Sequence, residues 1–372
     1  MRFCENCFID PEIKSTLSSL GIKEKSRGKC PICNKNHVYI YDTDKAHDIT
    51  INSYLEDLIS VYKVESELPK NFPSSEIRKL SEDIKTNWRI FNPIISNDNI
   101  ENIIRETVIK DGDVLEKYLS EKVGLFVLYD NEYVKKFSIL KNGDWDQFVE
   151  ELKFVNRFHS NYINIDNLQN LCKLVTRVEP KGKEFYRCRI INNNKKLSCK
   201  KMGAPPQGIS LDGRANSFGI SRLYLASDKY TAIGEVRSGA FDNVCVGKFV
   251  IDEDIYVVDL DILNEVSPFT AADISLYATN IKILNKINYE VSKVISANDN
   301  RIDYIPAQFI TDTIQAMKDS DGNPLYDGIK YTSTMKPGTY NLAIFNVDKA
   351  HCKRVYHYQI KEVFYETKRS SL

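Results

Sequence analysis

Apolar and polar residues are spaced differently in three successive parts of the chain. Residues 1 to about 45 carry two pairs of cysteines, a Lys/Gly/Ser-rich stretch between them, and an apolar-rich run from Val38 to Tyr41. From about residue 48 to 165, apolar residues recur at intervals of three and four, which predicts helices. From Glu184 onward, segments such as 248–262 and 328–347 are typical of strands, with a few short helices between them.

The helical pattern is clearest in residues 49–64 and continues in residues 99–122. In the first of these segments, one side of the predicted helix is formed by five apolar or aromatic residues: Ile51, Leu55, Leu58, Ile59 and Tyr62. Helices with such stripes are common to many proteins. We therefore expect the helical region to have a regulatory or oligomerising role, so that a homo-oligomer is one expected assembly.

These patterns define a predicted domain organisation. Residues 1–45 form a zinc-ribbon-like module, residues 46–178 a mainly helical region, and residues 179–372 a catalytic domain. The last boundary is placed in residues 178–183 (VEPKGK), because proline, glycine and lysine before the first strand are typical of a linker. The predicted fold class is α+β.

Composition narrows the class of protein. The 372 residues are 42% hydrophobic and 27% charged, which is typical of a soluble globular protein. Lys+Arg and Asp+Glu both number 51, so no overall charge directs the chain to nucleic acid or to an anionic membrane. Apolar runs such as 124–129 are far shorter than the ~20 residues that a membrane span needs, and the start lacks a signal-peptide core. We expect a cytoplasmic protein without membrane contact.

Four of the nine cysteines have the spacing of a metal site. Cys4 and Cys7 form one CxxC pair, and Cys30 and Cys33 form another. Two such pairs let four thiolates converge on Zn²⁺ in a closed tetrahedron, which stabilises a fold and leaves no position for a reacting water. We expect a structural zinc ribbon or treble clef, with His37 as a substitute ligand that four cysteines make unnecessary. The alternative is four unligated buried thiols.

The cysteine module is also locally basic, because it contains five cationic residues: Lys23, Lys25, Arg27, Lys29 and Lys35. A solvated charged face explains them adequately. Contact with nucleic acid through this module stays open as a second interpretation.

Several polar residues of the last part stand where packing alone does not require them. Arg187 and Arg189 alternate on a predicted strand and therefore share one face, which suits an anion. Arg214 follows a glycine in a loop and offers a planar fork to phosphate or carboxylate. Gln308 lies near the first turn of a predicted helix that starts at residues 304–308.

The stretch 223–237 (LYLASDKYTAIGEVR) predicts a strand, a cap and a short helix. In the strand, Tyr224 faces away from the leucines on either side of it. Ser227 or Asp228 can cap the helix, and Glu235 lies near its end. Farther on, alternation in the strand 328–333 places Ser333 on the buried side. Each of these residues taken singly has an ordinary structural explanation, such as a surface ion pair or a core tyrosine.

Their order along the chain resembles the RES domain, a bacterial family named for its arginine, glutamate and serine. The resemblance covers about residues 184–347 and rests on short motifs in sequence: FYRCR at 185–189, MGAPP at 202–206, GRAN at 213–216, LYLAS at 223–227, TAIGEVR at 231–237, YDGIKYTS at 326–333 and NLAIF at 341–345. Ala215 stands where many members carry tryptophan, and we expect this difference to alter the wall of the pocket. The front half resembles the zinc-binding and helical region of longer RES proteins.

The resemblance implies an ADP-ribosyltransferase-like fold, a split pair of small antiparallel sheets with NAD in the cleft. It also implies a toxin that breaks the bond between nicotinamide and ribose, with water or phosphate as acceptor. The family's basic positions would fall on Arg187 and Arg214, its aromatic position on Tyr224, its carboxylate on Glu235 and its serine on Ser333. Arg189 shares the face of Arg187 and competes for the same assignment.

The residue types support this chemistry independently. Cleavage of an N-glycosidic bond builds positive charge on the ribose, which a fixed carboxylate such as Glu235 stabilises. Nicotinamide leaves as a neutral molecule, so the reaction needs no strong acid. The arginines would bind the pyrophosphate, Tyr224 would stack on a ring, and Ser333 would hydrogen-bond ribose or carboxamide. The G-x-G-x-x-G fingerprint is absent from the sequence, so NAD is expected as a substrate and not as a redox cofactor.

Two alternatives remain open at this stage. An ADP-ribosyltransferase that modifies a protein or nucleic acid would use the same carboxylate and cleft. A zinc-ribbon binding protein with an inactive RES-like half would need neither. As a toxin or defence effector, the chain would also be expected to have a controlling partner, either an antitoxin or an activator protein.

Overall fold

The computed structural model describes most of the chain. The residues outside the description are 25–26, 46–49, 109–113, 142–143, 192–195, 265, 271–273, 294–300 and 365–372. The rest divides into two compact units. Unit 1 consists of Met1–Trp145, Asn161–Leu168 and Asn264–Asn285, and unit 2 of Asp146–Ser160, Gln169–Leu263 and Lys286–Leu372. The domain boundaries expected at residues 45 and 178 stay a prediction.

Unit 1 begins with a small antiparallel sheet and one helix. The sheet has the order β1 (Arg2–Cys4), β3 (Val38–Asp42), β2 (Arg27–Gly28), and α1 (Pro11–Glu24) packs on β3. Asp10 precedes α1 and accepts a hydrogen bond from the backbone N–H of Ile13 at 3.0 Å, which satisfies one of the free donors at the start of the helix. The sheet brings the two cysteine pairs together.

The remainder of unit 1 is mainly helical, as expected. Its helices are α2 (Thr50–Ser60), α3 (Leu80–Asn87), α4 (Asn97–Val108), α5 (Lys117–Ser120) and α6 (Asn131–Phe137), with a short strand pair β4 (Lys63–Val64) and β5 (Val123–Gly124). The five residues of the predicted stripe in 49–64 are all buried, and four of them lie on α2, whereas Tyr62 follows the end of that helix. The pattern over 99–122 includes residues of α4, through Val108, and all of α5 (Lys117–Ser120), while residues 109–113 lie outside the described residues.

Three further helices cross the boundaries between the two units along the chain. They are α7 (Trp145–Glu150), α8 (Ile165–Leu174) and α10 (Ile274–Ser292), and all three contribute residues to both units. In the part of the chain that the structure describes, no helix combines the length and the apolar character needed to cross a membrane.

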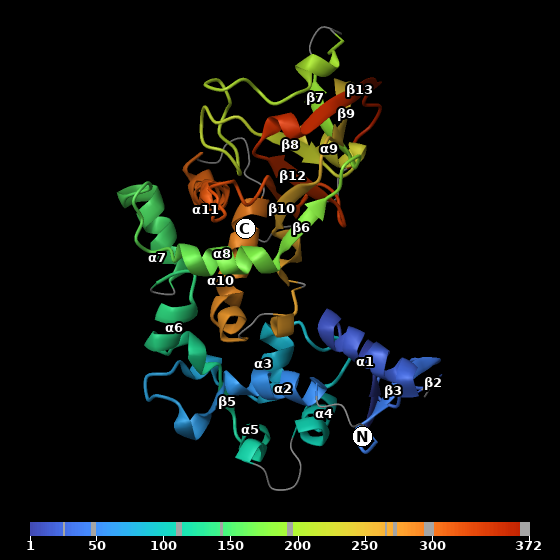
Figure 1. Cartoon of the computed structure of the whole chain (residues 1–372), viewed down its shortest axis with the longest axis vertical. Helices are drawn as coiled ribbons and strands as arrows, with labels where there is room; N and C mark the ends of the chain where they lie inside the picture. Colours follow the sequence, from blue (N-terminus) through green and yellow to red (C-terminus); the bar gives the residue numbers. More distant parts are fainter. Residues whose placement is uncertain are drawn as a thin grey trace. The chain divides into compact units, whose positions relative to one another are not determined.

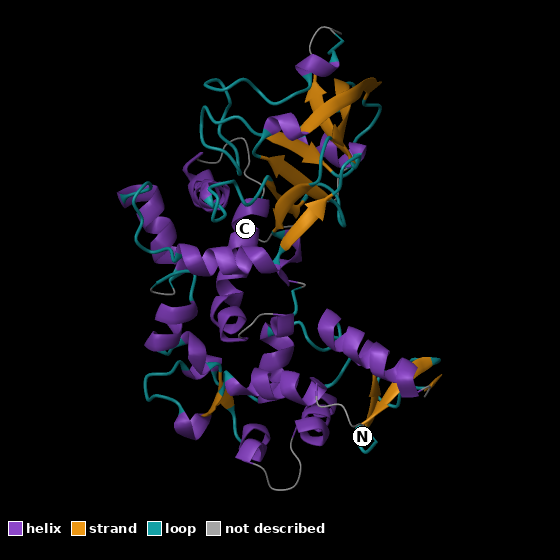
Figure 2. Ribbon diagram, in the orientation of Figure 1, coloured by secondary structure: helices purple, strands orange, loops and turns teal. Residues whose placement is uncertain are grey.

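Unit 2 is built on one mixed sheet of eight strands (Figures 1 and 2). Its order is β13 (Ala350–Gln359), β9 (Asn243–Ile251), β7 (Glu184–Ile190), β8 (Leu223–Ala226), β12 (Tyr340–Ile344), β11 (Gly328–Thr332), β10 (Ile255–Asp259) and β6 (Thr176–Glu179). All neighbours pair antiparallel except β10 and β11. The α+β class is confirmed, and the parallel pair is a finding that alternation in single strands does not reveal.

The sheet is divided in the middle. β7 pairs with β9 over seven residues but meets β8 in a single pair, Tyr186 with Ala226. The three strands β13, β9 and β7 therefore form one half, and the five from β8 to β6 form the other. Beyond the single pair the two strands diverge, so that both faces of β7 become available to line a space between the halves. The expected split sheet takes this form.

Two helices complete the part of unit 2 that carries the candidate residues. The short helix α9 (Lys229–Glu235) packs against β7, β8 and β9 (Figure 1). Ala232 of this helix belongs to a small apolar cluster together with Val244 and Val246 of β9. The helix α11 (Ile305–Ala316) starts with proline at its second residue, which costs no hydrogen bond there.

Candidate active site and metal-binding cluster

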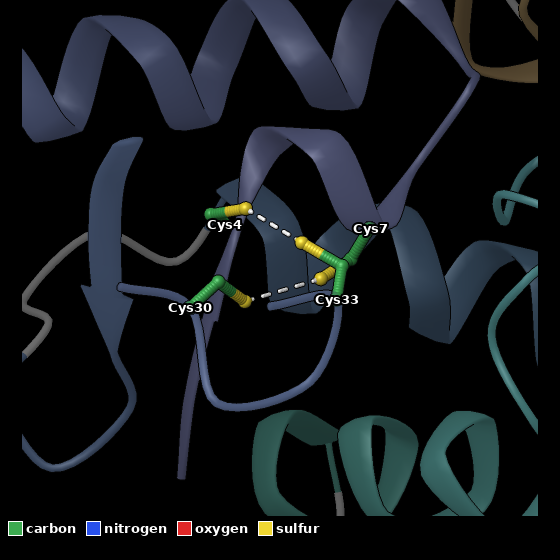
Figure 3. A group of neighbouring side chains, drawn as sticks. All are labelled: Cys4, Cys7, Cys30 and Cys33. Carbon is green, nitrogen blue, oxygen red and sulfur yellow. Dashed lines mark hydrogen bonds between the residues drawn. The ribbon is translucent and has the colours of Figure 1, made fainter. Parts of the chain in front are cut away.

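The four N-terminal cysteines lie together in unit 1 (Figure 3). The sulfurs of Cys4 and Cys33 are 3.5 Å apart, those of Cys7 and Cys30 are 3.6 Å apart, and all four lie within 4.8 Å of one another. Three of the residues are buried and Cys33 is half-buried. His37 is exposed and does not belong to the cluster. The expected convergence of the two CxxC pairs is confirmed.

The donor set fits a zinc ion. Four sulfurs at the usual Zn–S distance of about 2.3 Å from a central ion lie about 3.8 Å apart in a tetrahedron, close to the separations found here. Hydrogen bonds from Cys4 and Cys7 hold the pKa of the Cys30 thiol far below its usual range. A soft cation would neutralise the thiolates of such a cluster. With four protein ligands its role would be structural.

In unit 2, Glu235 is the last residue of helix α9 and lines a cavity. The side chain of Asp228 caps the helix by accepting hydrogen bonds from the backbone N–H groups of Tyr230 and Thr231, at 2.9 and 3.2 Å. Thr231 is fully buried and its hydroxyl bonds both Asp228 and Thr339, which anchors the first turn. The rigid first turn explains why a short helix can aim a carboxylate from its last residue.

Two side chains hold the Glu235 carboxylate. The hydroxyl of Ser333 donates to Oε1 at 2.9 Å, and the amide of Asn341 donates to the same oxygen at 2.6 Å. Both donors are buried. Because they bind the same oxygen, the orientation of the carboxylate is fixed. Ser333 had been expected to contact substrate, whereas here its hydroxyl contacts the glutamate.

The cavity itself measures about 490 Å³ and lies where β7 and β8 separate. Its lining contains four of the expected residues, Arg187, Arg214, Tyr224 and Glu235. Among the other lining residues are Tyr186, Cys188, Gly213, Arg237, Tyr304, Tyr331, Met335 and Asn341. Three consecutive residues of β7, Tyr186, Arg187 and Cys188, line the cavity. This is possible because the divergence of β7 and β8 exposes both faces of β7.

Arg187 and Arg189 have different surroundings although they share a strand face. The Nη1 atom of Arg187 is buried and has no hydrogen-bond partner among the described residues. Burial, with a smaller effect of the neighbouring Arg189 charge, lowers the pKa of Arg187 to about 10. An anion would supply what this guanidinium lacks. Arg189 instead donates to the backbone oxygen of Gly203 at 2.8 Å and is not part of the cavity lining.

The loop that carries Arg214 is held by side-chain hydrogen bonds. The Tyr224 hydroxyl donates to Oδ1 of Asn216 at 2.7 Å and accepts from the backbone N–H of Ala215 at 3.0 Å. A Cβ on Gly213 would lie 2.9 Å from both of those side-chain oxygens, so any larger residue there would have to displace the hydrogen-bonded pair of Tyr224 and Asn216. Burial raises the pKa of Tyr224 well above its usual value, which keeps the hydroxyl protonated and able to donate.

Gln308 and Ala215 support this loop from outside the cavity. The Gln308 amide donates to the backbone oxygens of Gly213 and Asn216 at 2.9 and 3.0 Å. Gln308 is absent from the lining and contacts the loop, and its contact with substrate stays a prediction. Ala215 is fully buried and also absent from the lining, so the small residue at this position does not shape the cavity wall directly.

Sequence reasoning missed several residues of the cavity, above all Asn341. A signal existed, because an asparagine at the start of the apolar segment 341–345 is unusual for a buried strand unless its amide is bonded. Tyr331 offered a similar signal, since alternation places it on the same face as Ser333, which directly follows β11. In the structure, burial raises the pKa of Tyr331 well above its usual value. Tyr304 and Met335 lie outside strands, and no pattern in the sequence marks them.

The fold and the cavity together define a class of protein. An α+β domain with a divided sheet holds arginines, tyrosine rings and an oriented carboxylate around one cavity, which suits an anionic ligand with flat rings. Residues 185–365 match the family model of the RES domain, and the chain therefore contains a RES domain over these residues. RES domains are known from families of NAD-degrading toxins. No curated protein and no solved structure was found to match the chain.

Proposed function

We propose that the chain is an NAD-consuming enzyme, a toxin or defence effector, that cleaves the bond between nicotinamide and ribose. The observation that carries the proposal is the arrangement around Glu235. Its carboxylate is fixed by Ser333 and Asn341 and faces a cavity that also contains two arginines, Arg187 and Arg214. One carboxylate and two cations in a single cavity match a dinucleotide that carries a cationic nicotinamide ring at one end and a pyrophosphate between its two riboses.

The chemistry requires little beyond these groups. The C–N bond between the ribose and the pyridinium ring breaks, both electrons remain on the nitrogen, and nicotinamide leaves as a neutral molecule. Positive charge then develops on the ribose, and the Glu235 carboxylate stabilises it electrostatically. Water or phosphate adds to the same carbon, and the proton of an attacking water is released to solvent. The products are nicotinamide and either ADP-ribose or its 1-phosphate.

Binding of the rest of NAD is assigned to the other residues of the cavity. Arg187 offers a buried guanidinium nitrogen that lacks a partner among the described residues, which suits a phosphate oxygen. Arg214 donates to the backbone oxygen of Ser292 at 3.0 Å through Nη1, which leaves its other nitrogens for the pyrophosphate. The rings of Tyr224 and Tyr331 provide flat apolar walls for a base or for nicotinamide.

The test is direct. The purified chain is incubated with NAD, and free nicotinamide, ADP-ribose and ADP-ribose 1-phosphate are separated and measured with and without added phosphate. We expect nicotinamide release that falls about 100- to 1,000-fold in Glu235→Gln, the loss typical of one electrostatic contact to a transition state. Glu253→Gln serves as the matched control, since Glu253 is a solvent-exposed glutamate of the same unit that pairs with Lys349.

The outcomes separate the proposal from its alternatives. Release of nicotinamide without free ADP-ribose, with label from the adenosine retained on protein or nucleic acid, would favour an ADP-ribosyltransferase. Intact NAD after incubation with folded, zinc-loaded protein would favour a binding protein with an inactive RES domain. Growth arrest on expression, relieved by Glu235→Gln and not by Glu253→Gln, is the result expected of a toxin.

A further inference from the structure

Unit 2 carries a continuous row of tyrosine rings and cationic side chains beside the cavity. We name it the tyrosine stripe and define it by six residues: Lys336, Tyr230, Lys229, Tyr358, Tyr356 and Arg354. The Nζ atom of Lys336 lies 5.8 Å from the centre of the Tyr230 ring, and that of Lys229 lies 4.7 Å from Tyr230 and 5.3 Å from Tyr358. Tyr358 and Tyr356 stack with centres 6.4 Å apart, and the Arg354 guanidinium lies 5.2 Å from Tyr356. Each member therefore contacts the next.

The rings and charges of the stripe are available to a ligand. Tyr230 is 64% exposed and Tyr358 is 36% exposed, so their rings are not used in the core. Lys336 pairs with Asp228 at 3.5 Å, a half-exposed ion pair that water and salt weaken. Within the described part of the chain, Lys229 and Arg354 face rings and form no ion pair with an acidic side chain.

The stripe meets the cavity on two sides. Across the sheet, Arg354 of β13 pairs with Lys248 of β9, which pairs with Tyr186 of β7, a residue that lines the cavity. Paired residues project from the same face, so this row runs from the edge of the sheet to the cavity wall. On the other side, Lys336 directly follows Met335, which also lines the cavity. Lys248 is paired with Glu184 at 2.6 Å and adds little net charge.

Exposed aromatic rings interspersed with cations are the pattern that binds a single-stranded polynucleotide. Successive bases stack on aromatic side chains while cations neutralise the phosphates between them. A duplex would hide the base faces that the rings need. A protein strand added to β13 would use the backbone groups of this edge strand and would gain nothing specific from tyrosines and cations on the face. We infer that the tyrosine stripe binds single-stranded nucleic acid and leads it toward the cavity.

This inference concerns a surface and not the reaction, so it stands apart from the proposed function. Binding is measured by fluorescence anisotropy with the full chain and a fluorescein-labelled single-stranded RNA of about 20 nucleotides, without NAD. Three unpaired or weakly paired cations predict that log K falls against log salt with a slope of about −2, at about 0.7 per neutralised phosphate. Arg354→Ala is expected to reduce that slope by about 0.7.

The tyrosines are tested by Tyr230→Ala and Tyr356→Ala. Loss of one stacked base is expected to weaken binding between about fivefold and about 150-fold. Two controls lie in the same unit. Tyr256→Ala removes a 51% exposed tyrosine from β10, and Lys318→Ala removes an exposed lysine after α11. Both controls are expected to bind like the unmodified chain.

Three results would overturn the inference. One is the absence of saturable RNA binding at low salt, which is also the outcome expected if the face serves a protein partner. Another is an equal loss of affinity in Tyr256→Ala and Tyr356→Ala. The third is binding that is unchanged in both stripe variants but lost in Arg27→Ala, because that would transfer the activity to the cysteine module.

Discussion

Asn341 makes the clearest prediction for the proposed reaction. Its amide donates to Oε1 of Glu235 at 2.6 Å, and the hydroxyl of Ser333 donates to the same oxygen at 2.9 Å. Replacing Asn341 with leucine keeps the size of the buried side chain and removes the donor. The carboxylate is then held by Ser333 alone, so its position in the cavity is fixed less firmly.

The size of the effect follows from the type of hydrogen bond. A bond to a charged group contributes about 1.5–3 kcal/mol, which corresponds to a loss in rate of about 12- to 150-fold. Because the amide is committed to Glu235, we expect the loss in kcat for NAD cleavage, with KM changed by less than about threefold. Initial rates of nicotinamide release over a range of NAD concentrations separate the two constants.

Ser333→Ala is the matched comparison, because it removes the other donor to the same oxygen. Since the two donors act on one atom, their effects should not add, and the double variant should depart from the sum by at least about 0.5 kcal/mol. Thermal unfolding of each variant verifies that it is folded. A folded Asn341→Leu variant with kcat within twofold of the original would refute the reasoning, and so would a change confined to KM, which would mean that Asn341 contacts NAD itself.

Three further predictions follow from other parts of the structure. Cys30→Ser should lose zinc and have a lower thermal midpoint of unfolding, as measured by elemental analysis and thermal unfolding. Cys172→Ser changes a buried cysteine outside the cluster and should keep the metal. Equal zinc content in the two variants would contradict a four-cysteine site and favour four unligated thiols. Gly213→Ala should strongly reduce the rate of nicotinamide release, because the added Cβ would lie 2.9 Å from Tyr224 Oη and Asn216 Oδ1 and would displace the loop of Arg214. Full activity would mean that the loop can shift without affecting cleavage. Arg187→Ala should raise KM for NAD by about tenfold or more and Arg189→Ala by much less, since only Arg187 lines the cavity; the opposite order would reverse the assignment.

Spacing in the sequence was sufficient for the elements whose pattern is local. The two CxxC pairs converge, the stripe in residues 49–64 is buried, and the strand, cap and helix of 223–237 occur as β8, Asp228 and α9. In each case a short period or a known spacing determines the structure, because the chain needs no distant partner to satisfy it.

Alternation could not separate Arg187 from Arg189, because it assigns a face and not a position along the strand. The difference arises from distant segments. The pairing of β8 with β7 ends at Tyr186, next to Arg187, whereas Arg189 donates a hydrogen bond to the backbone oxygen of Gly203. Asn341 and Ser333 meet Glu235 for the same reason, from strands about a hundred residues away in sequence. Contacts of that range depend on sheet order, which the sequence patterns of single strands do not contain.

The single pair between β7 and β8 connects the fold to the proposed chemistry. A fully paired sheet in this place would put Tyr186 and Cys188 on one face and Arg187 on the other, so that one cavity could not contain all three. Divergence after Tyr186 and Ala226 exposes both faces of β7 at once. Arg187 therefore lines the same cavity as Glu235, the last residue of α9. Extending the β7–β8 ladder by even one further pair would therefore be expected to close the cavity, whatever residues lined it.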